Sequence, residues 1–362
     1  MRIKKLNIKN FKSLVDFELE NLKPFCVFVG PNASGKSNIF EALEFTNYFV
    51  KYTVEAPSFF GGVKNIYSYY PTRVEETNFQ SDLSEALVFN YSFEDGIQLD
   101  AVAQIIQQEE HQSTFPAMSG TLKPEQLNFY NIRDLQKRKQ FINQWKNRGN
   151  PYHFDFEQFI DNFSRIFVGK PQINKGPQIN SKLSPDASNL SQIIGGIFED
   201  QEARQDFIEW LRILIPEFRD IEVKKSNIDG TYDFFIFEKT SQKPFPRHLV
   251  SDGTMNILSL MAAVYQVKQP QFLCIEEPEN GLHPQAIELL VDFFREKCED
   301  GGHHIWLATH SQTLVRCLEI EEVVLVNKLN GITKAKQLTQ EDNIDIKTDE
   351  AWLSNALGGG VL

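Results

Sequence analysis

The residues best suited to chemistry occupy positions 30–38, Gly-Pro-Asn-Ala-Ser-Gly-Lys-Ser-Asn. Their spacing matches the pattern G-x-x-x-x-G-K-[ST], which is typical of loops that bind nucleotide phosphates. Glycines let such a loop turn tightly, so that its backbone N–H groups point at phosphate oxygens. Lys36 would reach the β- and γ-phosphates, and the Ser37 hydroxyl would hold Mg²⁺. The predicted nucleotide-binding residues are Gly30, Pro31, Asn32, Ala33, Ser34, Gly35, Lys36, Ser37 and Asn38.

The segments on either side of this loop have the character that the pattern requires. Residues 25–29 are apolar throughout, which predicts a buried strand entering the loop. Residues 37–50 place apolar side chains among polar ones at helical spacing, which predicts a helix leaving it. The N-terminus of that helix would add the field of its dipole to phosphate binding. This context disfavours a chance match in a Gly/Ser turn.

A second group of acidic residues follows an apolar strand at 272–275. The strand ends in Glu276 and Glu277. Beside a phosphate loop, such a strand supplies the acid that coordinates Mg²⁺, directly or through water. We assign Glu276 to the metal and Glu277 to the attacking water, which it would polarise as the base. The alternative is a pair of solvated acids at a strand end.

Two further motifs stand near these acids in the chain. Ser251, Asp252, Gly253 and Thr254 open a helix, where a hydroxyl and free N–H groups can face an anion, although any capped helix looks similar. Thr309-His310-Ser311 follows the apolar run 305–308, which places an imidazole at the carboxyl end of the predicted sheet. A lone histidine is more often structural, but its position after the acidic strand favours a functional role for His310.

The rest of the chain separates into regions of different character. Residues 1–29 alternate as a hairpin and a following strand, and 86–93 and 98–106 predict a small antiparallel sheet. Between 107 and 220 the pattern predicts helices at 124–145, 154–167, 188–198 and 201–214, which are interrupted by prolines. Strands at 221–225 and 232–238 follow. Strand–helix alternation from 255 to 308 predicts a parallel sheet covered on both faces.

Composition describes an ordinary globular chain of 362 residues with a net charge of −12. Residues 116–190 carry 11 Lys/Arg and 6 Asp/Glu, a local balance of +5. This positive charge can belong to a solvated helix face without a specific role. The alternative is a patch that binds nucleic acid or an acidic partner. The four cysteines lack metal-ligand spacing. No apolar run reaches about 18 residues and no signal peptide is recognised, so we expect a cytoplasmic protein without membrane contact.

Five strings together resemble the ABC-type ATPase heads of the SMC/RecF branch. They are 10–13 (Asn-Phe-Lys-Ser), 30–38, 251–254, 275–284 and 309–311. The likeness is strongest to stand-alone heads akin to the ATPase half of OLD (overcoming lysogenization defect) proteins, and it covers 1–110 and 220–330. It implies an α/β P-loop NTPase with a mixed sheet flanked by helices, an antiparallel β-subdomain and an inserted helical lobe. The implied parts are half-heads at 1–110 and 221–340, the lobe at 111–220 and a tail at 341–362.

The resemblance also implies how the site works. Two heads would sandwich two ATP molecules with Mg²⁺, and residues 251–254 of one would contact the γ-phosphate on the other's loop. His310 would sense that phosphate, and Asn32 would lie near the facing signature. Lys12 and Ser13 match positions that approach the nucleotide in related heads. The glutamine that usually completes the metal site is not identified; Gln80 and Gln98 are the candidates.

Two departures from the family pattern shape the functional hypotheses. Only about 215 residues separate Lys36 from Ser251, too few for long SMC arms, and about 50 follow Ser311, too few for the nuclease domain of OLD proteins. The first hypothesis is a homodimeric ATP-driven switch, with higher oligomers left open, that controls a separate nuclease or toxin in anti-phage defence. The alternative is a RecF-like repair ATPase that clamps duplex DNA. A transporter subunit is disfavoured.

Overall fold

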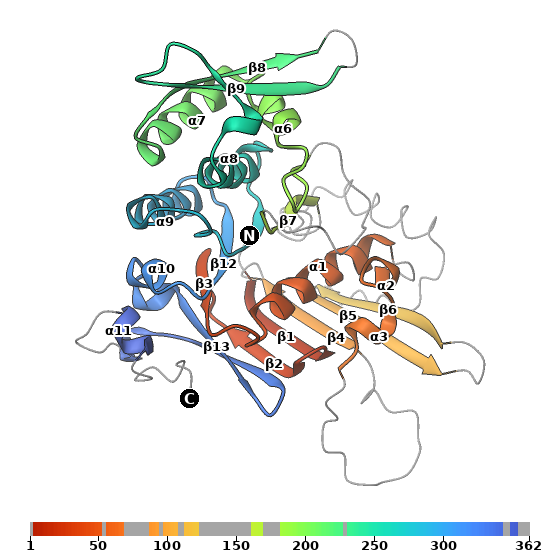
Figure 1. Ribbon diagram of the computed structural model, residues 1–362. Coiled ribbons are helices and arrows are strands. Elements are labelled where there is room, and N and C mark those ends of the chain that lie inside the picture. Colours follow the sequence, from red (N-terminus) through yellow and green to blue (C-terminus); the bar gives the residue numbers. More distant parts are fainter. Residues whose placement is uncertain are drawn as a thin grey trace, which may run out of the picture.

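A six-stranded sheet forms the centre of the computed structural model (Figure 1). Its order is β14-β13-β3-β12-β11-β7, and all neighbouring strands are parallel except β13 and β14. The strands are β3 (Phe25–Val29), β7 (Phe163–Ile166), β11 (Phe272–Glu276), β12 (His304–Thr309), β13 (Val323–Leu329) and β14 (Ile332–Gln337). The structure describes residues 3–52, 56–68, 87–93, 97–107, 112–122, 161–168, 182–226, 230–342 and 348–353.

Side chains that alternate along these strands build two separate apolar layers. Cys26, Phe28, Cys274 and Trp306 pack on the face covered by α1 (Lys36–Tyr52). Their chain neighbours in β3, β11 and β12 pack on the other face, against α8 (Asp252–Tyr265) and α9 (Pro284–Glu299). A continuous apolar strand is what a sheet covered on both faces requires. This confirms the prediction of a parallel sheet covered on both faces.

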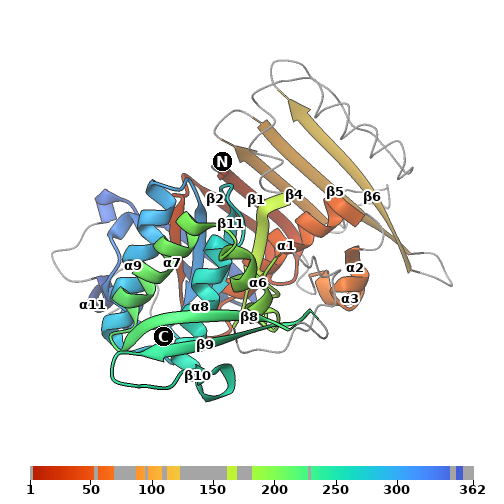
Figure 2. The ribbon, with the colours of Figure 1, turned by 90° about the horizontal axis from the view of Figure 1, so that it is seen from above.

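The α1 layer is closed by an antiparallel sheet in the order β2-β1-β4-β5-β6. Its strands are β1 (Ile3–Phe11), β2 (Leu14–Glu20), β4 (Leu87–Phe93), β5 (Ile97–Gln107) and β6 (Gln112–Leu122). Two short helices, α2 (Ala56–Phe59) and α3 (Val63–Ile66), follow α1. Figure 2 shows this sheet on the same side of the molecule as α1. The predicted N-terminal hairpin and the strands at 86–93 and 98–106 are confirmed.

The third sheet lies at the far end of the molecule from β1 and β2 (Figure 1). It has the order β10-β9-β8 and consists of β8 (Phe218–Lys225), β9 (Tyr232–Glu238) and β10 (Phe245–Pro246). One face packs on α6 (Leu190–Ile197) and α7 (Gln201–Leu214), which lie against α8. The remaining elements are η4 (Arg247–Leu249), α10 (Gln312–Arg316), η5 (Ile320–Glu322), η6 (Gln340–Asp342) and α11 (Thr348–Leu353).

The segment predicted to be a helical lobe, 111–220, is helical only in part. Helices α6 and α7 confirm the predictions at 188–198 and 201–214, but β6 and β7 lie in the same segment. The predicted helix 154–167 is wrong at 163–166, because these residues pair in parallel with β11 and extend the central sheet. The four residues Phe-Ser-Arg-Ile are too few to show either period, and here the tertiary pairing decides. The predicted helix 124–145 lies outside the described residues, and the division into domains stays a prediction.

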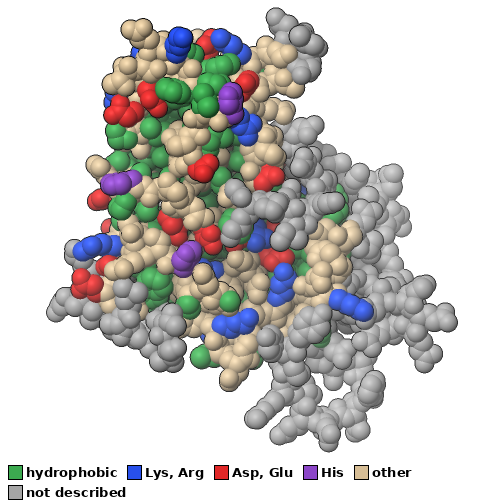
Figure 3. All heavy atoms as spheres, viewed as in Figure 1, with side chains coloured by type: hydrophobic (Ala, Val, Ile, Leu, Met, Phe, Trp, Pro, Cys, Tyr) green, Lys and Arg blue, Asp and Glu red, His purple; other side chains and the backbone are tan. Residues whose placement is uncertain are grey.

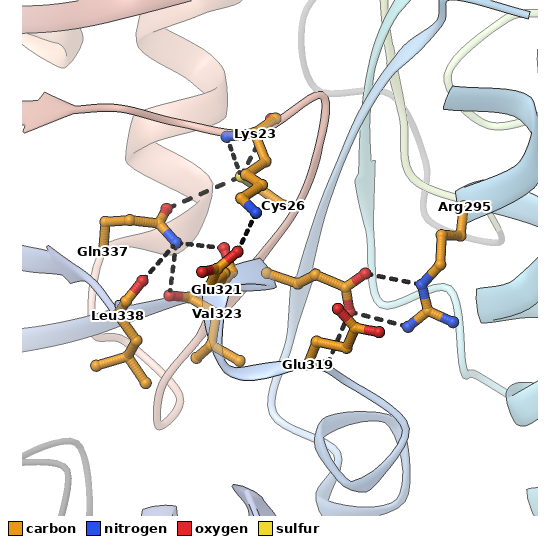
Figure 4. A network of polar contacts seen from close by, with 9 residues as sticks. Lys23, Cys26, Arg295, Glu319, Glu321, Val323, Gln337 and Leu338 are labelled. Atoms are coloured by element: carbon orange, nitrogen blue, oxygen red, sulfur yellow. Dashed lines mark hydrogen bonds and ion pairs between the residues drawn. The ribbon is translucent and has the colours of Figure 1, made fainter. Parts of the chain in front are cut away.

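A polar network fixes the edge of the sheet at which β3 begins (Figure 4). Gln337 donates from Nε2 to the carbonyl oxygens of Glu321 (2.7 Å) and Val323 (3.2 Å), and Lys23 pairs with the Glu321 carboxylate. Beside it, Arg295 of α9 donates to both carboxylate oxygens of Glu322 at 2.8 and 2.9 Å. These bonds tie α9 and η5 to the amino end of β3, on the edge opposite the loop at 30–38.

The cysteines are free thiols, and none has the surroundings of a metal ligand. Cys26, Cys274 and Cys298 are buried and Cys317 is half-buried. Among the residues that the structure describes, no group of three or more His, Cys, Asp or Glu side chains is arranged to hold a metal ion by itself. A search of the same residues finds no helix with the length and apolar character needed to cross a bilayer.

The packing of Trp306 in the central sheet leads us to expect a large loss of stability when this side chain is removed. Its ring is fully buried, lies 4.8 Å from the Phe272 ring centroid, and donates from Nε1 to the Lys23 carbonyl. Trp306→Ala should lower the free energy of unfolding in urea by about 3–5 kcal/mol, because it leaves a cavity in the α1 layer. The matched control Leu329→Ala removes a side chain that is 60% exposed and should change it by no more than about 0.5 kcal/mol. Equal effects of the two substitutions would show that the α1 layer does not stabilise the fold as described.

Candidate nucleotide-binding site

The loop 30–38 joins β3 to α1 and lies directly on the β13–β14 hairpin. A Cβ atom at Gly35 would come within 1.9 Å of Thr333 Oγ1, and one at Gly30 within 2.1 Å of the Val326 carbonyl oxygen. Gly35 also has φ +103°, a conformation that favours glycine. The close approach of the hairpin therefore requires both glycines, and the backbone conformation also requires Gly35.

A chain of hydrogen bonds joins the loop to β14 and to Ser13. Thr333 donates from Oγ1 to the Ser34 carbonyl at 2.9 Å, and Ser13 Oγ lies 2.6 Å from the same hydroxyl. Asn38 donates from Nδ2 to Ser13 Oγ at 2.7 Å. Ser13 is thus placed beneath the loop, where it braces the backbone. Sequence reasoning missed Thr333, since a threonine in a C-terminal hairpin carries no motif.

Lys12 and the tip of the loop occupy more open positions. Lys12 has φ +49°, and its ammonium group pairs with Glu41 of α1 at 2.6 Å. Asn32 and Ala33 are exposed at the tip. Asn32 and Ala33 are therefore accessible to solvent, or to a second molecule, at the tip of the loop.

Lys36 lies inside the curve of the loop. Its ammonium group donates to the carbonyl oxygens of Gly30 (2.7 Å) and Pro31 (2.9 Å). Burial lowers the pKa of Lys36, an effect that the carboxylates of Glu277, Glu279 and Glu276 oppose. The structure thus brings the predicted lysine and the predicted acids into one electrostatic environment.

Ser37 and Glu276 meet across the start of α1. The Ser37 hydroxyl donates to Glu276 Oε2, and Glu276 is only 4% exposed at the end of β11. A hydroxyl and a carboxylate are oxygen ligands of the kind that Mg²⁺ prefers, and Mg²⁺ usually completes its shell with water and substrate phosphates. The exposed position of Ser37 leaves room for those ligands on the solvent side. The predicted pair therefore fits the metal.

The other oxygen of Glu276 is held by a residue that sequence reasoning did not single out. Arg165 of β7 donates from Nε to Glu276 Oε1 at 2.7 Å and from Nη1 to Glu44 Oε2 at 2.9 Å. Burial raises the pKa of Glu44, and the Arg165 charge opposes that shift. The sequence around Arg165, Asn-Phe-Ser-Arg-Ile-Phe-Val, mixes polar and apolar residues and carries no motif.

Glu277 adopts a backbone conformation that few non-glycine residues take. Its φ is +49°, its N–H donates to the Ala308 carbonyl at 2.8 Å, and its carboxylate accepts from Asn280 Nδ2 at 3.0 Å. Such a conformation persists only where neighbouring contacts impose it. The loop after β11 therefore fixes the direction of the predicted base.

His310 is exposed directly after β12, and a second acid supports the turn that carries it. Thr309 donates from Oγ1 to Glu279 Oε1 and accepts from the Ser311 N–H at 2.9 Å. Burial raises the pKa of Glu279, whereas the Thr309 bond and the nearby His310 lower it. Sequence reasoning missed Glu279 because Glu276 and Glu277 had already been assigned the two acidic roles, metal ligand and base.

The turn 251–254 caps α8 and packs on the loop after Glu277. Ser251 Oγ accepts from the Thr254 N–H at 3.2 Å, and a Cβ atom at Gly253 would come within 2.4 Å of the Gly281 carbonyl oxygen. Asn256 donates to the carbonyl oxygens of Pro278 and Asn280. Ser251 and Asp252 are exposed, and among the described residues no hydrogen bond or ion pair joins 251–254 to 30–38. In this structure the Ser251 hydroxyl bonds within its own turn, to Thr254.

Solved structures of SMC heads share this fold. The chain is similar to an SMC head bound to the C-winged helix domain of ScpA, with 16% identity, a TM-score of 0.58, and coverage of 96% of this chain and 100% of the other. It is also similar to an SMC head with an extended coiled coil bound to the C-terminal domain of ScpA, derived from Pyrococcus furiosus (12% identity, TM-score 0.56, 94% and 96% covered). The fold is therefore that of an SMC-head P-loop ATPase, with a mixed central sheet and additional antiparallel sheets.

Comparison by sequence gives a relative and a family. An "ATP/GTP phosphatase" from Helicobacter pylori is 22% identical over 367 residues, which cover 94% of this chain and 93% of that protein. The family model described as "AAA domain, putative AbiEii toxin, Type IV TA system" matches residues 25–316, from the strand before the phosphate loop to the helix after His310. Because this match spans most of the chain, the protein belongs to that AAA-domain family.

Proposed function

We propose that this chain is an ATP-driven switch that dimerises around two ATP molecules and controls a separate effector protein. The observation that carries the proposal is the convergence of Lys36, Ser37, Glu276, Glu277 and His310 at one edge of the central sheet, on an SMC-head fold. The family match and the relative named as an ATP/GTP phosphatase support hydrolysis of ATP.

Each residue of the site has a defined task in this proposal. Backbone N–H groups of the loop and the Lys36 ammonium bind the β- and γ-phosphates, and Ser37 and Glu276 hold Mg²⁺, which when bound neutralises phosphate charge. Glu277 accepts a proton from the attacking water, and its fixed backbone restricts where that water can stand. His310 lies at the end of the neighbouring strand, where it can donate to the γ-phosphate.

The second half of the site comes from a partner copy. Ser251 and Asp252 are exposed at the start of α8, where a helix N-terminus can face a phosphate of another protomer. The Ser251 hydroxyl, which here donates to Thr254 Oγ1 at 3.0 Å, would turn from that bond to the phosphate. This arrangement makes ATP part of the dimer interface. Binding therefore closes the dimer and hydrolysis opens it.

The assignment of a separate effector rests on the comparisons and on the family resemblance. The family description names a toxin and a type IV TA system, and the two SMC heads above are each bound to a domain of ScpA. These findings support a nuclease or toxin on another polypeptide, in anti-phage defence, as the resemblance to OLD-type ATPases implies.

The alternative, clamping of duplex DNA, would require basic side chains at the surface. Two cations of the segment 116–190 are used inside the protein: Arg165 pairs with Glu276, and Lys182 bonds to the carbonyl oxygen of Phe163. Burial lowers the pKa of Lys182 to about 8. Figure 3 shows acidic and basic side chains interspersed on the described part of one face. The cations at 133–148 lie outside the described residues.

Lys36→Ala tests nucleotide binding. The substitution removes the charged donor inside the loop, so affinity for a fluorescent ATP analogue should fall at least about tenfold in an anisotropy titration. The control Lys336→Ala removes an exposed lysine of β14, whose side chain is 61% exposed, and should bind like the wild type. Unchanged affinity of Lys36→Ala would refute the assignment of the loop.

Glu277→Gln tests hydrolysis and the dimer together. The amide cannot accept the proton, so turnover should fall by about 10²–10⁴-fold while ATP stays bound, and light scattering should detect a lasting ATP-dependent dimer. Glu288→Gln, on an exposed position of α9, is the control. Adding Ser251→Arg to Glu277→Gln should abolish the dimer and leave ATP affinity unchanged. A dimer that survives this second change would place the interface elsewhere.

The effector is tested by affinity purification from the native host. Tagged Glu277→Gln should retain a second polypeptide in an ATP-dependent manner, and tagged Lys36→Ala should retain less of it, because only the former holds the ATP-bound state. Mass spectrometry identifies the polypeptide. Equal recovery with both variants, or recovery of none, would count against nucleotide control of an effector.

A further inference from the structure

Arg165 joins the two elements whose spacing sets the candidate metal site. Its strand β7 pairs with β11 so that Arg165 stands opposite Cys274, two residues before Glu276. In parallel strands paired residues point to the same face, so the guanidinium enters the layer between the sheet and α1. There it meets Glu44, seven residues after Ser37 along the same helix. One side chain therefore contacts both β11 and α1.

The hydrogen bonds divide the two oxygens of Glu276 between different partners. Nε (2.7 Å) and Nη2 (2.5 Å) of Arg165 both approach Oε1, whereas Oε2 receives the Ser37 hydroxyl. The third contact, from Nη1, goes to Glu44. A guanidinium is planar and its donors have fixed directions, so it can hold a carboxylate in one orientation as an ammonium group cannot. The geometry leaves Oε2 directed at Ser37.

The charges also require this residue. Glu276 and Glu44 are both buried, at 4% and 7% exposure, and buried carboxylates are costly unless they are paired. Among the described residues, Arg165 is the cation that the structure pairs with either of them. Its removal would leave two unpaired carboxylates in the apolar layer beneath the start of α1.

We infer that Arg165 is a positioning residue for the metal side of the nucleotide site: it turns Glu276 Oε2 toward Ser37 and braces α1 against β11. The inference rests on the proposed function, because it concerns Mg²⁺ that accompanies a bound nucleotide. Arg165 itself need not touch nucleotide or metal. Its effect reaches the site through the orientation of Glu276 and the placement of Ser37.

The test is a Mg²⁺ titration of nucleotide binding by the full chain. A fluorescent ATP analogue is held at fixed concentration, Mg²⁺ is varied, and the affinity for the analogue in EDTA is measured separately. Arg165→Met should raise the Mg²⁺ concentration for half-saturation by about tenfold or more, the usual effect of losing a residue that orients a metal ligand. Affinity in EDTA should stay within about twofold, because the loop and Lys36 are intact. Arg165→Lys should fall between the two, since it keeps the charge and loses the planar fork.

Arg295→Met is the matched control. It also breaks a two-bond arginine–carboxylate pair, with Glu322, but at the opposite edge of the sheet (Figure 4). It should lower the melting temperature and leave the Mg²⁺ dependence unchanged. Glu44→Gln keeps the bonds between Arg165 and Glu276 and should shift the Mg²⁺ half-saturation less than Arg165→Met does.

Several outcomes would overturn the inference. They are wild-type Mg²⁺ dependence in Arg165→Met, an equal loss of affinity with Mg²⁺ and in EDTA, or an equal shift in Arg295→Met. If circular dichroism shows that Arg165→Met does not fold, Arg165→Lys decides: a shift of about threefold or more supports the inference, and the wild-type value refutes it. Absence of Mg²⁺-dependent binding in the wild type would instead refute the proposed function.

Discussion

The close approach of the β13–β14 hairpin to the loop 30–38 is the constraint on which the site depends. Two positions of the loop have no room for a Cβ atom, because a carbonyl oxygen and a threonine hydroxyl of the hairpin lie against them. The same hydroxyl supports the Ser34 carbonyl and the Ser13 hydroxyl. The C-terminal strands thus hold the loop in shape from outside, and the loop in turn sets where α1 begins. Every contact between α1 and the acids of β11 follows from that placement.

Sequence predicted the parts of this arrangement that local chemistry dictates. The loop and the acidic strand end each combine special residues with a strand or helix pattern. The turn at 251–254 and the histidine after β12 are weak signals alone, and their order relative to the acidic strand distinguished them. Three supporting residues escaped, namely Thr333, Arg165 and Glu279. Each acts through a partner more than 25 positions away in the chain, and no local pattern marks such a pairing. The four-residue strand β7 was missed for the same reason, since only its pairing with β11 makes it a strand.

The molecule contains two arginine–carboxylate arrangements, and they have different structural roles. At the edge where β3 begins, Arg295 and Glu322 join α9 to η5 by two parallel bonds, which orders the backbone where no ligand is expected. At the opposite edge, Arg165 divides its donors between two carboxylates and leaves one oxygen of Glu276 for another partner. A buried pair is weak evidence for stability, because its desolvation cost offsets much of its attraction. The second arrangement is better explained by the geometry that it imposes.

The packing of the turn 251–254 on the loop after Glu277 affects when the two sites of the proposed dimer hydrolyse ATP. Gly253 lies against Gly281, and Asn256 bonds to the carbonyl oxygens of Pro278 and Asn280, so direct contacts join the two segments. In the proposed dimer, one segment contacts the partner's nucleotide and the other carries the base for the protomer's own nucleotide. A change at either phosphate would therefore be transmitted mechanically to the chemistry at the other. Such a coupling would make turnover cooperative: the two ATP molecules of a dimer would be hydrolysed together rather than independently.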